Sequence, residues 1–187
     1  MNAFARLPLV LASERLRLRV LEARDAPALF DLYSDPDVMR YWNHAAWTCL
    51  AQADLAIDNA RAEYARGATI HCAIEQRSTG TVIGSCALYD FACHDNSAQL
   101  GYLLSPRHWG QGYLSEAMEQ FLNFAFRQLR LERLRAQVHP ENTASAGLLG
   151  KLGFLSQGWT GENWIVAGRT LQTQSYLLLR SGWLGTP

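Results

Sequence analysis

The sequence has no excess of charge of either sign and no long apolar run. Its 187 residues carry 17 Lys and Arg against 17 Asp and Glu, and no run of basic residues is longer than two. Nucleic-acid binding draws on clustered basic residues that neutralise phosphates, so no nucleic-acid partner is expected. The apolar stretch near the N-terminus is too short for a signal-peptide core or a membrane span. We therefore expect a cytoplasmic protein without membrane contact.

Cysteine is scarce and forms no motif. The four cysteines lack the CxxC spacing of a zinc site, and four in a chain of this length do not make a disulfide scaffold. They are Cys49, Cys72, Cys86 and Cys93. We expect them to be free thiols, buried or half-buried, and we expect no metal site.

Internal repeats, low-complexity tracts and linkers are absent as well. With 49% hydrophobic residues, the chain can bury about two-thirds of its unfolded surface around one core. A single domain over 1–187 is therefore expected.

The first half of the chain is predicted to begin with a strand and two helices. Alternating apolar residues indicate the strand, and apolar residues at helical spacing indicate the helices. Thr48 is a plausible N-cap for the second helix, and Gly67 ends it. The expected elements are a strand over 14–21, helices over 25–33 and 48–66 with a break at 34–37, and strands over 69–75, 81–89 and 98–104. The last three strands have hairpin spacing and should form an antiparallel meander.

The second half of the chain alternates helices and strands. The expected elements are a helix over 114–126, a strand over 133–138, a helix over 143–152, and a closing hairpin of strands 159–166 and 170–179 around the turn 167–169. The order is βααβββαβαββ, which indicates an α/β (α+β) fold. The helical crossover between strands 98–104 and 133–138 makes those two strands parallel neighbours.

A glycine-containing turn lies between strand 98–104 and the next helix. Gly110 and Gly112 let successive N–H groups point into one concavity, and the helix N-terminus adds partial positive charge; both suit a pyrophosphate. On this feature alone, a turn that merely links strand to helix is an equally good interpretation. No Lys-Ser/Thr pair follows as in a P-loop, and no third glycine completes a dinucleotide fingerprint. Coenzyme A remains, because its pantetheine arm can pair with an exposed strand edge.

Two motifs flank this turn in a recognisable order. The first, from Leu100 to Ala117, contains LGYLLSP, WGQGY and EA; the second, from Val138 to Phe154, contains VHPENTAS and LGF. Together they resemble the GNAT superfamily of acetyl-CoA-dependent N-acetyltransferases, in particular the branch with the ribosomal-protein alanine and serine N-acetyltransferases. The resemblance covers about 14–180. It implies one acetyltransferase domain with a mixed, mostly antiparallel central sheet and helices on both faces.

The resemblance also implies acetyl-CoA as the cofactor and an amine as the acceptor. It places the pantetheine arm along Tyr102, Leu103 and Leu104, and the pyrophosphate in the backbone amides of the turn. The turn residues that it assigns are Gly110, Gln111, Gly112, Tyr113, Leu114 and Ser115. Leu114 stands where the family has a small residue, so packing beneath the pyrophosphate is expected to differ.

The acid–base residues of many superfamily members are missing at the matching positions. Gln137 and Leu149 stand where a glutamate base and a tyrosine acid are common, and Gln99 stands in place of another carboxylate. The resemblance suggests Ser145 as the hydrogen-bond donor to the leaving thiolate, and Asn142 as a ligand for the pantetheine arm or a water.

Each of these remaining polar residues also has a plain structural interpretation. Asn142 and Ser145 can cap the helix over 143–152, which is compatible with a ligand role. His139 shares a strand face with Gln137 and is a possible base or water-holder, although an exposed loop histidine is the alternative. We expect the amine to lose its proton through water, with little help from one side chain.

By the same resemblance, acceptor specificity comes from the loop between the first two helices and from the closing hairpin, with a contribution from the meander. The aromatic candidates in these segments are Tyr41, Trp42, His44, Trp47, Tyr89, Trp159 and Trp164. Of these, Tyr41, Trp42, Tyr89 and Trp164 are the expected pocket residues. Aromatic rings can hold the chain of an amine by stacking or cation–π contact, although such residues are often ordinary core. Gln172 replaces the family's usual Asp, so a peptide N-terminus or small amine is favoured over a highly cationic acceptor.

Two other functions stay open at this point. A catalytically weak acyl-CoA-binding sensor is consistent with the lost acid–base residues. A dinucleotide-dependent oxidoreductase is a poorer alternative, because its fingerprint is missing. The protein is expected to be a monomer or a homodimer.

Overall fold

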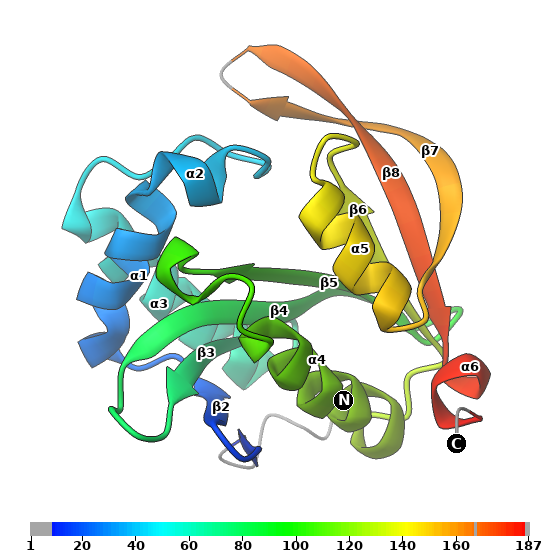
Figure 1. The fold of residues 1–187 in the computed structure, drawn as a ribbon, viewed down its shortest axis with the longest axis horizontal. Coiled ribbons are helices and arrows are strands. Elements are labelled where there is room, and N and C mark those ends of the chain that lie inside the picture. Colours follow the sequence, from blue (N-terminus) through cyan, green and yellow to red (C-terminus); the bar gives the residue numbers. More distant parts are fainter. Residues whose placement is uncertain (1–8, 167, 186–187) are drawn as a thin grey trace.

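One eight-stranded sheet runs through the part of the chain that the computed structural model describes, residues 9–166 and 168–185 without the side chains of 160–163 and 169 (Figure 1). The strand order is β1-β2-β3-β4-β5-β6-β8-β7, and the neighbouring strands are antiparallel except for β5 and β6. The strands are β1 (Val10–Ala12), β2 (Leu16–Val20), β3 (Ile70–Gln76), β4 (Val82–Ala92), β5 (Ser97–Leu104), β6 (Arg133–Val138), β7 (Leu155–Val166) and β8 (Arg169–Leu179). The predicted mixed, mostly antiparallel sheet is confirmed.

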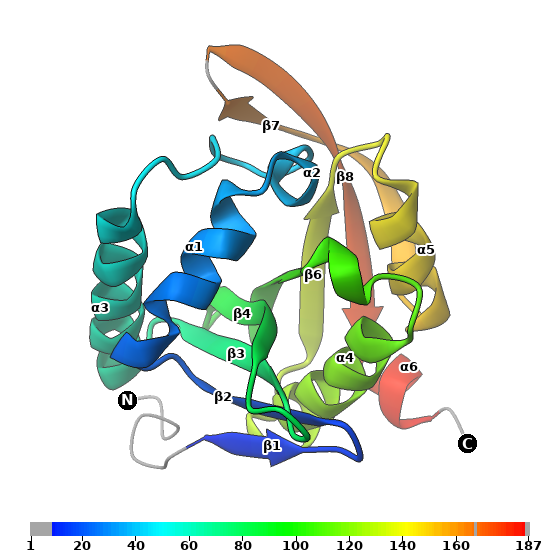
Figure 2. The same cartoon turned by 60° about the vertical axis from the view of Figure 1, so that its left-hand side comes forward.

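Helices cover both faces of the sheet (Figure 2). The helices are α1 (Ala26–Ser34), α2 (Pro36–Met39), α3 (Leu50–Arg66), α4 (Tyr113–Asn123), α5 (Thr143–Lys151) and α6 (Arg180–Leu184). One apolar core lies between the sheet and α4, where Met118, Phe121 and Leu122 bury a stripe at helical spacing. A second core joins the other face to α1 and α3 through Leu29 and Ile57.

The sheet opens between its two parallel strands. β5 and β6 pair only through Ser97–Arg133, Ala98–Leu134 and Gln99–Arg135. Beyond Gln99, β5 continues to pair with β4 on its other side, and β6 continues to pair with β8. Strand-edge N–H and C=O groups that face this opening can bind an extended ligand, because buried backbone groups require partners.

Several boundaries in the first half differ from the prediction. The short strand β1 was not predicted, and the opening strand is shorter than 14–21 because the Ser13 amide bonds the Leu16 carbonyl in a turn. The N-cap of α3 is Cys49, whereas the Thr48 amide bonds the side chain of Gln52. Gly67 ends α3 in the left-handed conformation, as predicted.

The second half shows differences at the ends of its elements. The helix predicted over 114–126 begins at Tyr113 and changes at Phe124 into a π-helical turn that runs to Gln128. Helix α6 was not predicted, and β7 begins at Leu155. The predicted hairpin turn 167–169 includes residue 167, which lies outside the described residues.

All four cysteines are free thiols, as predicted, but only two are buried. Cys72 and Cys86 face each other across β3 and β4 in the core. Cys49 and Cys93 are exposed, which corrects the expectation of buried or half-buried thiols for these two. Cys49 is exposed because it caps α3 at the surface.

A buried ion cluster connects β2 to β3 and to the start of α1. Arg19 of β2 forms two hydrogen bonds with the Asp25 carboxylate, at 2.7 and 2.8 Å, and a third with Glu75 of β3 at 2.8 Å. All three residues are at least nine-tenths buried. Paired charges with satisfied hydrogen bonds can be buried, whereas removing one partner is strongly destabilising. The cluster therefore fixes the entry of α1 against the sheet.

Candidate active site

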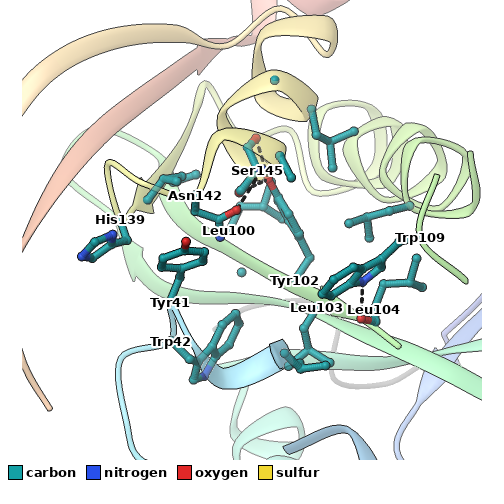
Figure 3. Close-up of a pocket in the computed structure, with 18 of the residues that line it drawn as sticks. Tyr41, Trp42, Leu100, Tyr102, Leu103, Leu104, Trp109, His139, Asn142 and Ser145 are labelled. Atoms are coloured by element: carbon teal, nitrogen blue, oxygen red, sulfur yellow. Dashed lines mark hydrogen bonds between the residues drawn. The ribbon is translucent and has the colours of Figure 1, made fainter. Parts of the chain in front are cut away.

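A cavity of about 720 Å³ lies where β5 and β6 separate, a volume typical of small-molecule sites (Figure 3). Its walls come from the ends of these strands, the glycine turn before α4, the start of α5, α2 with the loop after it, and one residue each from β4 and β7. The sequence-predicted site residues that line it are Tyr41, Trp42, Tyr89, Tyr102, Leu103, Leu104, Gly110, Gly112, Tyr113, Leu114, Ser115, His139, Asn142, Ser145 and Trp164. Gln111 does not line it; its carbonyl accepts from Arg15 and its side chain bonds the carbonyl of Arg107.

The glycine turn presents backbone amides to the cavity. Gly110 and Gly112 have φ values of +72° and +78°, the left-handed region in which a side chain is strained. Gly112 is the N-cap of α4, and within the described chain no side chain caps the amides of the first turn. These amides and the positive end of the helix dipole fit a phosphate group.

An ionic anchor holds the turn against the first strands. The Arg15 guanidinium pairs with Glu116 of α4 at 2.6 Å, donates to the Gln111 carbonyl at 3.0 Å and lies over the ring of Tyr113. Partial burial of Glu116 acts to raise its pKa, but hydrogen bonds from Ser13 and Arg15 outweigh it, so that the pKa is lowered. Sequence reasoning missed this anchor, because nothing near Arg15 in the chain indicates its partner about a hundred residues away.

Two hydroxyl groups meet at the start of α5. The Tyr102 hydroxyl of β5 lies 2.8 Å from Ser145 Oγ (Figure 3). Burial raises the pKa of Tyr102 to about 12, so its hydroxyl keeps its proton at neutral pH. Asn142 is the N-cap of α5, where its Oδ1 accepts from the Ser145 amide at 3.1 Å, and its side chain also lines the cavity. The cap predicted for Asn142 is thus present.

His139 lies at the end of β6 and stacks on Tyr41, with ring centroids 5.2 Å apart. The Glu141 amide donates to His139 Nδ1 at 3.3 Å. A neutral imidazole that accepts at Nδ1 carries its proton on Nε2. In this arrangement neither ring nitrogen of His139 has a free lone pair, which suits a water-holder better than a base.

The positions without the expected acid–base groups have other contacts. Gln137 Oε1 accepts from Trp164 Nε1 at 2.9 Å, so this amide anchors the indole of β7. Leu149 is fully buried in the core, and its neighbour Leu148 faces the cavity instead. Gln99 Oε1 and His108 Nδ1 are buried atoms without a hydrogen-bond partner in the described chain, and His108 lines the cavity. Because buried polar atoms require hydrogen-bond partners, His108 Nδ1 in this wall is consistent with a polar ligand that supplies one.

The aromatic residues divide into two groups. Tyr41, Trp42, Tyr89 and Trp164 line the cavity, as expected of acceptor-pocket residues. The other aromatic candidates do not: Trp47 and His44 stack on the buried ring of Tyr33, and Trp159 is exposed on β7. Sequence reasoning also missed Asp37, which lines the cavity from a segment interpreted only as a helix break.

Metal and membrane features are absent from the described ranges. Among the side chains that the structure describes, no three of His, Cys, Asp or Glu come together in a way that could hold a metal ion. No helix in that part of the chain is both long and apolar enough to cross a membrane.

Comparisons with known proteins agree with this geometry. Residues 15–155 match the family model of the acetyltransferase (GNAT) domain. The uncharacterized N-acetyltransferase p20 of Bacillus licheniformis is 34% identical over 94% of this chain and 98% of its own length. A provisional ribosomal-protein-serine acetyltransferase of Vibrio cholerae has a solved structure with a TM-score of 0.80 and 25% identity, covering 91% of this chain and 97% of that one. A spermidine N-acetyltransferase of Vibrio cholerae, solved with CoA and spermine, has a TM-score of 0.80 and 23% identity over 92% and 99%.

Proposed function

The chain belongs to the GNAT family and is an acetyl-CoA-dependent N-acetyltransferase, and we propose that the cavity between β5 and β6 is its active site. The observation that carries the proposal is the early separation of these parallel strands, directly beside the uncapped amides of the glycine turn. One feature suits an extended amide chain and the other suits a pyrophosphate, and coenzyme A contains both.

Different parts of the cavity wall would bind different parts of the cofactor. The edge of β5 at Tyr102, Leu103 and Leu104 would hold the pantetheine arm, and the amides from Gly110 to Ser115 would hold the pyrophosphate. Gln111 would contribute only its peptide group, since its side chain bonds Arg107. Trp109 Nε1 donates to the Leu104 carbonyl at 2.8 Å and so closes the turn on the strand. When bound, acetyl-CoA supplies the thioester that the amine attacks.

The reaction forms a C–N bond and breaks the C–S bond of the thioester. The amine would give its proton to water, the CoA sulfur would leave as a thiolate, and that thiolate would take a proton from water. Ser145 would donate a hydrogen bond to the leaving sulfur. Tyr102, with a pKa of about 12 against about 8.5 for an ordinary thiol, is too weak an acid to protonate that thiolate well. Its hydroxyl instead orients the hydroxyl of Ser145.

The acceptor would enter between the α2 side and the β7–β8 hairpin, where Tyr41, Trp42, Tyr89 and Trp164 form the wall. A peptide N-terminus or a small-molecule amine fits this wall. His139 and Asn142 would hold a water through which the proton leaves. We propose that the protein carries out this acetylation in the cytoplasm.

Thiol release tests the proposed function. The purified protein is given acetyl-CoA with a panel of small amines and peptides, free CoA is measured with a thiol reagent, and products are identified by mass spectrometry. We expect amine-dependent release and an acetylated product. Tight CoA binding without turnover on every amine would favour an acyl-CoA sensor instead. His139→Ala and Ser145→Ala are then compared across pH, and an unchanged profile in both would remove these residues from the mechanism.

A further inference from the structure

The cavity wall contains one carboxylate. Asp37 of α2 is the only Asp or Glu side chain that lines the cavity among the described residues. The basic groups in the same wall are His139 at the end of β6, His108 before the glycine turn and Lys151 in the last turn of α5. Among the side chains that the structure describes, Asp37 is thus the one carboxylate of the acceptor side, which α2 and the aromatic residues form. The Arg40 guanidinium lies 5.2 Å from the centroid of the Tyr41 ring but does not line the cavity.

Asp37 is available to a ligand. The cap of α2 is formed by Asp35, whose carboxylate accepts from the Asp37 amide at 2.8 Å and from the Val38 amide at 3.4 Å. The backbone of Asp37 is thus held in place while its own side chain is not needed for capping. Within the described part of the chain, its exposed carboxylate forms no ion pair.

The rest of the acceptor wall is largely aromatic, and a glycine provides the space between the rings. A Cβ on Gly101 of β5 would lie 3.4 Å from the Tyr89 ring and 3.9 Å from the Trp42 ring. Any larger side chain at this position would fill the space that these two rings border. The rings of Tyr41 and Trp164 complete the wall. Such a surface attracts apolar and aromatic groups and one cation over a ring face.

We propose that the acceptor is a primary amine with a single positive charge, attached to an aromatic or branched apolar group, and that Asp37 binds its ammonium before deprotonation. This inference rests on the proposed function and narrows it. A second or third ammonium of a polyamine would find no further carboxylate among the described side chains of the wall, and an unpaired charge next to apolar rings is costly. The same chemistry is present in a free arylalkylamine and in a peptide with an aromatic or branched N-terminal residue.

Steady-state kinetics with three acceptors test the inference. The kcat/KM values of 2-phenylethylamine, a short peptide with N-terminal phenylalanine and spermidine are measured at saturating acetyl-CoA. At least one of the two monocationic acceptors should exceed spermidine by about tenfold or more, the scale of one charge-assisted hydrogen bond. Whichever of these two acceptors has the higher kcat/KM shows whether the pocket prefers a small-molecule amine or a peptide N-terminus. A higher kcat/KM for spermidine would overturn the inference and leave acetyl transfer itself intact.

Substitution of the carboxylate tests the role of Asp37. Asp37→Asn should raise the KM of the preferred amine by about tenfold and leave the KM of acetyl-CoA unchanged. Asp54→Asn, at an exposed position of α3 outside the cavity, makes the same change in net charge and is the matched control. Equal kinetics in the two variants would remove Asp37 from acceptor binding. If no amine is turned over although CoA binds, the proposed function fails and the inference with it.

A variant that fills the pocket tests the aromatic wall without changing charge. Gly101→Val should lower kcat/KM for 2-phenylethylamine much more than for methylamine, because the added methyl groups occupy the space beside Tyr89 and Trp42. The far-ultraviolet circular dichroism spectrum and the thermal unfolding midpoint serve as the folding control, because Gly101 lies on the strand edge that is expected to bind CoA. An equal loss for both amines would show that these rings do not hold the carrier group.

Discussion

At the scale of single residues, the proposed catalysis depends mainly on the paired hydroxyl groups of Tyr102 and Ser145. Neither a glutamate nor a tyrosine occupies the matching acid–base positions, since Gln137 anchors Trp164 and Leu149 is buried in the core. The groups that remain are hydrogen-bond donors. We propose that such a site would stabilise a leaving thiolate and leave proton transfer to water, which would be adequate because thiols are fairly acidic.

A double-mutant cycle tests this pair. Ser145→Ala and Tyr102→Phe should each lower kcat by about fivefold, because each removes a hydrogen bond worth about 1 kcal/mol. If Tyr102 acts by orienting Ser145, the double variant should lose little more than the worse single variant. The KM of acetyl-CoA, measured in the same experiments, reports any loss of cofactor binding. Fully additive losses in kcat would show that the two hydroxyls act separately.

A second residue-scale prediction concerns His71 on β3. Its Nε2 lies 3.2 Å from Ser85 Oγ, and burial lowers its pKa to about 4, although Glu63 acts to raise it. The unfolded chain, with an ordinary histidine pKa of about 6.5, therefore binds an extra proton between about pH 4 and 6.5. Stability is complete above pH 6.5 and falls as the pH is lowered, by up to about 3 kcal/mol at pH 4.

Urea unfolding at several pH values measures this slope. His71→Gln should remove most of the loss of unfolding free energy between pH 6.5 and 4. His94→Gln changes a histidine whose side chain is 82% exposed, and it should keep the wild-type slope. Identical slopes in wild type and His71→Gln would contradict the account of His71.

At the scale of elements, the site depends on segments that are distant in sequence. The glycine turn is held by Arg15 from just before β2, and the acceptor wall combines the α2 loop with the β7–β8 hairpin (Figure 1). In both ribbon views this hairpin projects beyond the rest of the sheet. The Trp164–Gln137 hydrogen bond connects it to β6.

Arg15→Ala tests whether the anchor shapes the turn. Loss of the contacts to Glu116 and the Gln111 carbonyl should loosen the amides and weaken CoA binding several-fold in isothermal titration calorimetry. Because the ion pair is exposed, the effect should shrink as salt is raised. Arg24→Ala, which removes an exposed arginine outside the cavity, is the control. Unchanged affinity in Arg15→Ala would show that the turn keeps its shape without the anchor.

The elements of the fold were largely predictable from sequence because their signals are local. Alternation gave the strands, β6 to the residue, and helical spacing gave α1, α3, α4 and α5 within a few residues. The missed elements, β1, α2 and α6, are short and lack periodicity. The π-helical turn after Phe124 was also missed, because its apolar residues continue the stripe of α4.

The residues of the candidate cofactor half of the cavity could be named from the sequence for a related reason. Its residues come from one continuous strand, turn and helix, so their spacing in sequence is their spacing in the cavity. The acceptor half was only partly predictable. Aromatic residues could be named as candidates, but Trp42 and Trp47 differ only in which way the loop turns them. Asp37 and Arg15 gain their positions from contacts across the fold, and no local pattern marks such contacts.

At the scale of the whole molecule, the described sheet is continuous except where β5 and β6 separate. Antiparallel pairing runs from β1 to β5 and from β6 to β7, and the only parallel pair in the described chain is the one that separates. A ligand inserted there would complete the hydrogen bonding of both strands. The single-domain organisation over 1–187 stays a prediction, consistent with one continuous sheet.

Hydrogen exchange with and without CoA tests the central claim most directly. In the wild-type protein, CoA should slow amide exchange in Leu100–Leu104 and in Gly110–Ser115, because the ligand supplies partners to the open strand edge and the uncapped turn. The amides of β3, paired on both sides, should not change. Tight binding of CoA without protection in either segment would contradict the assignment of this cavity as the acetyl-CoA site.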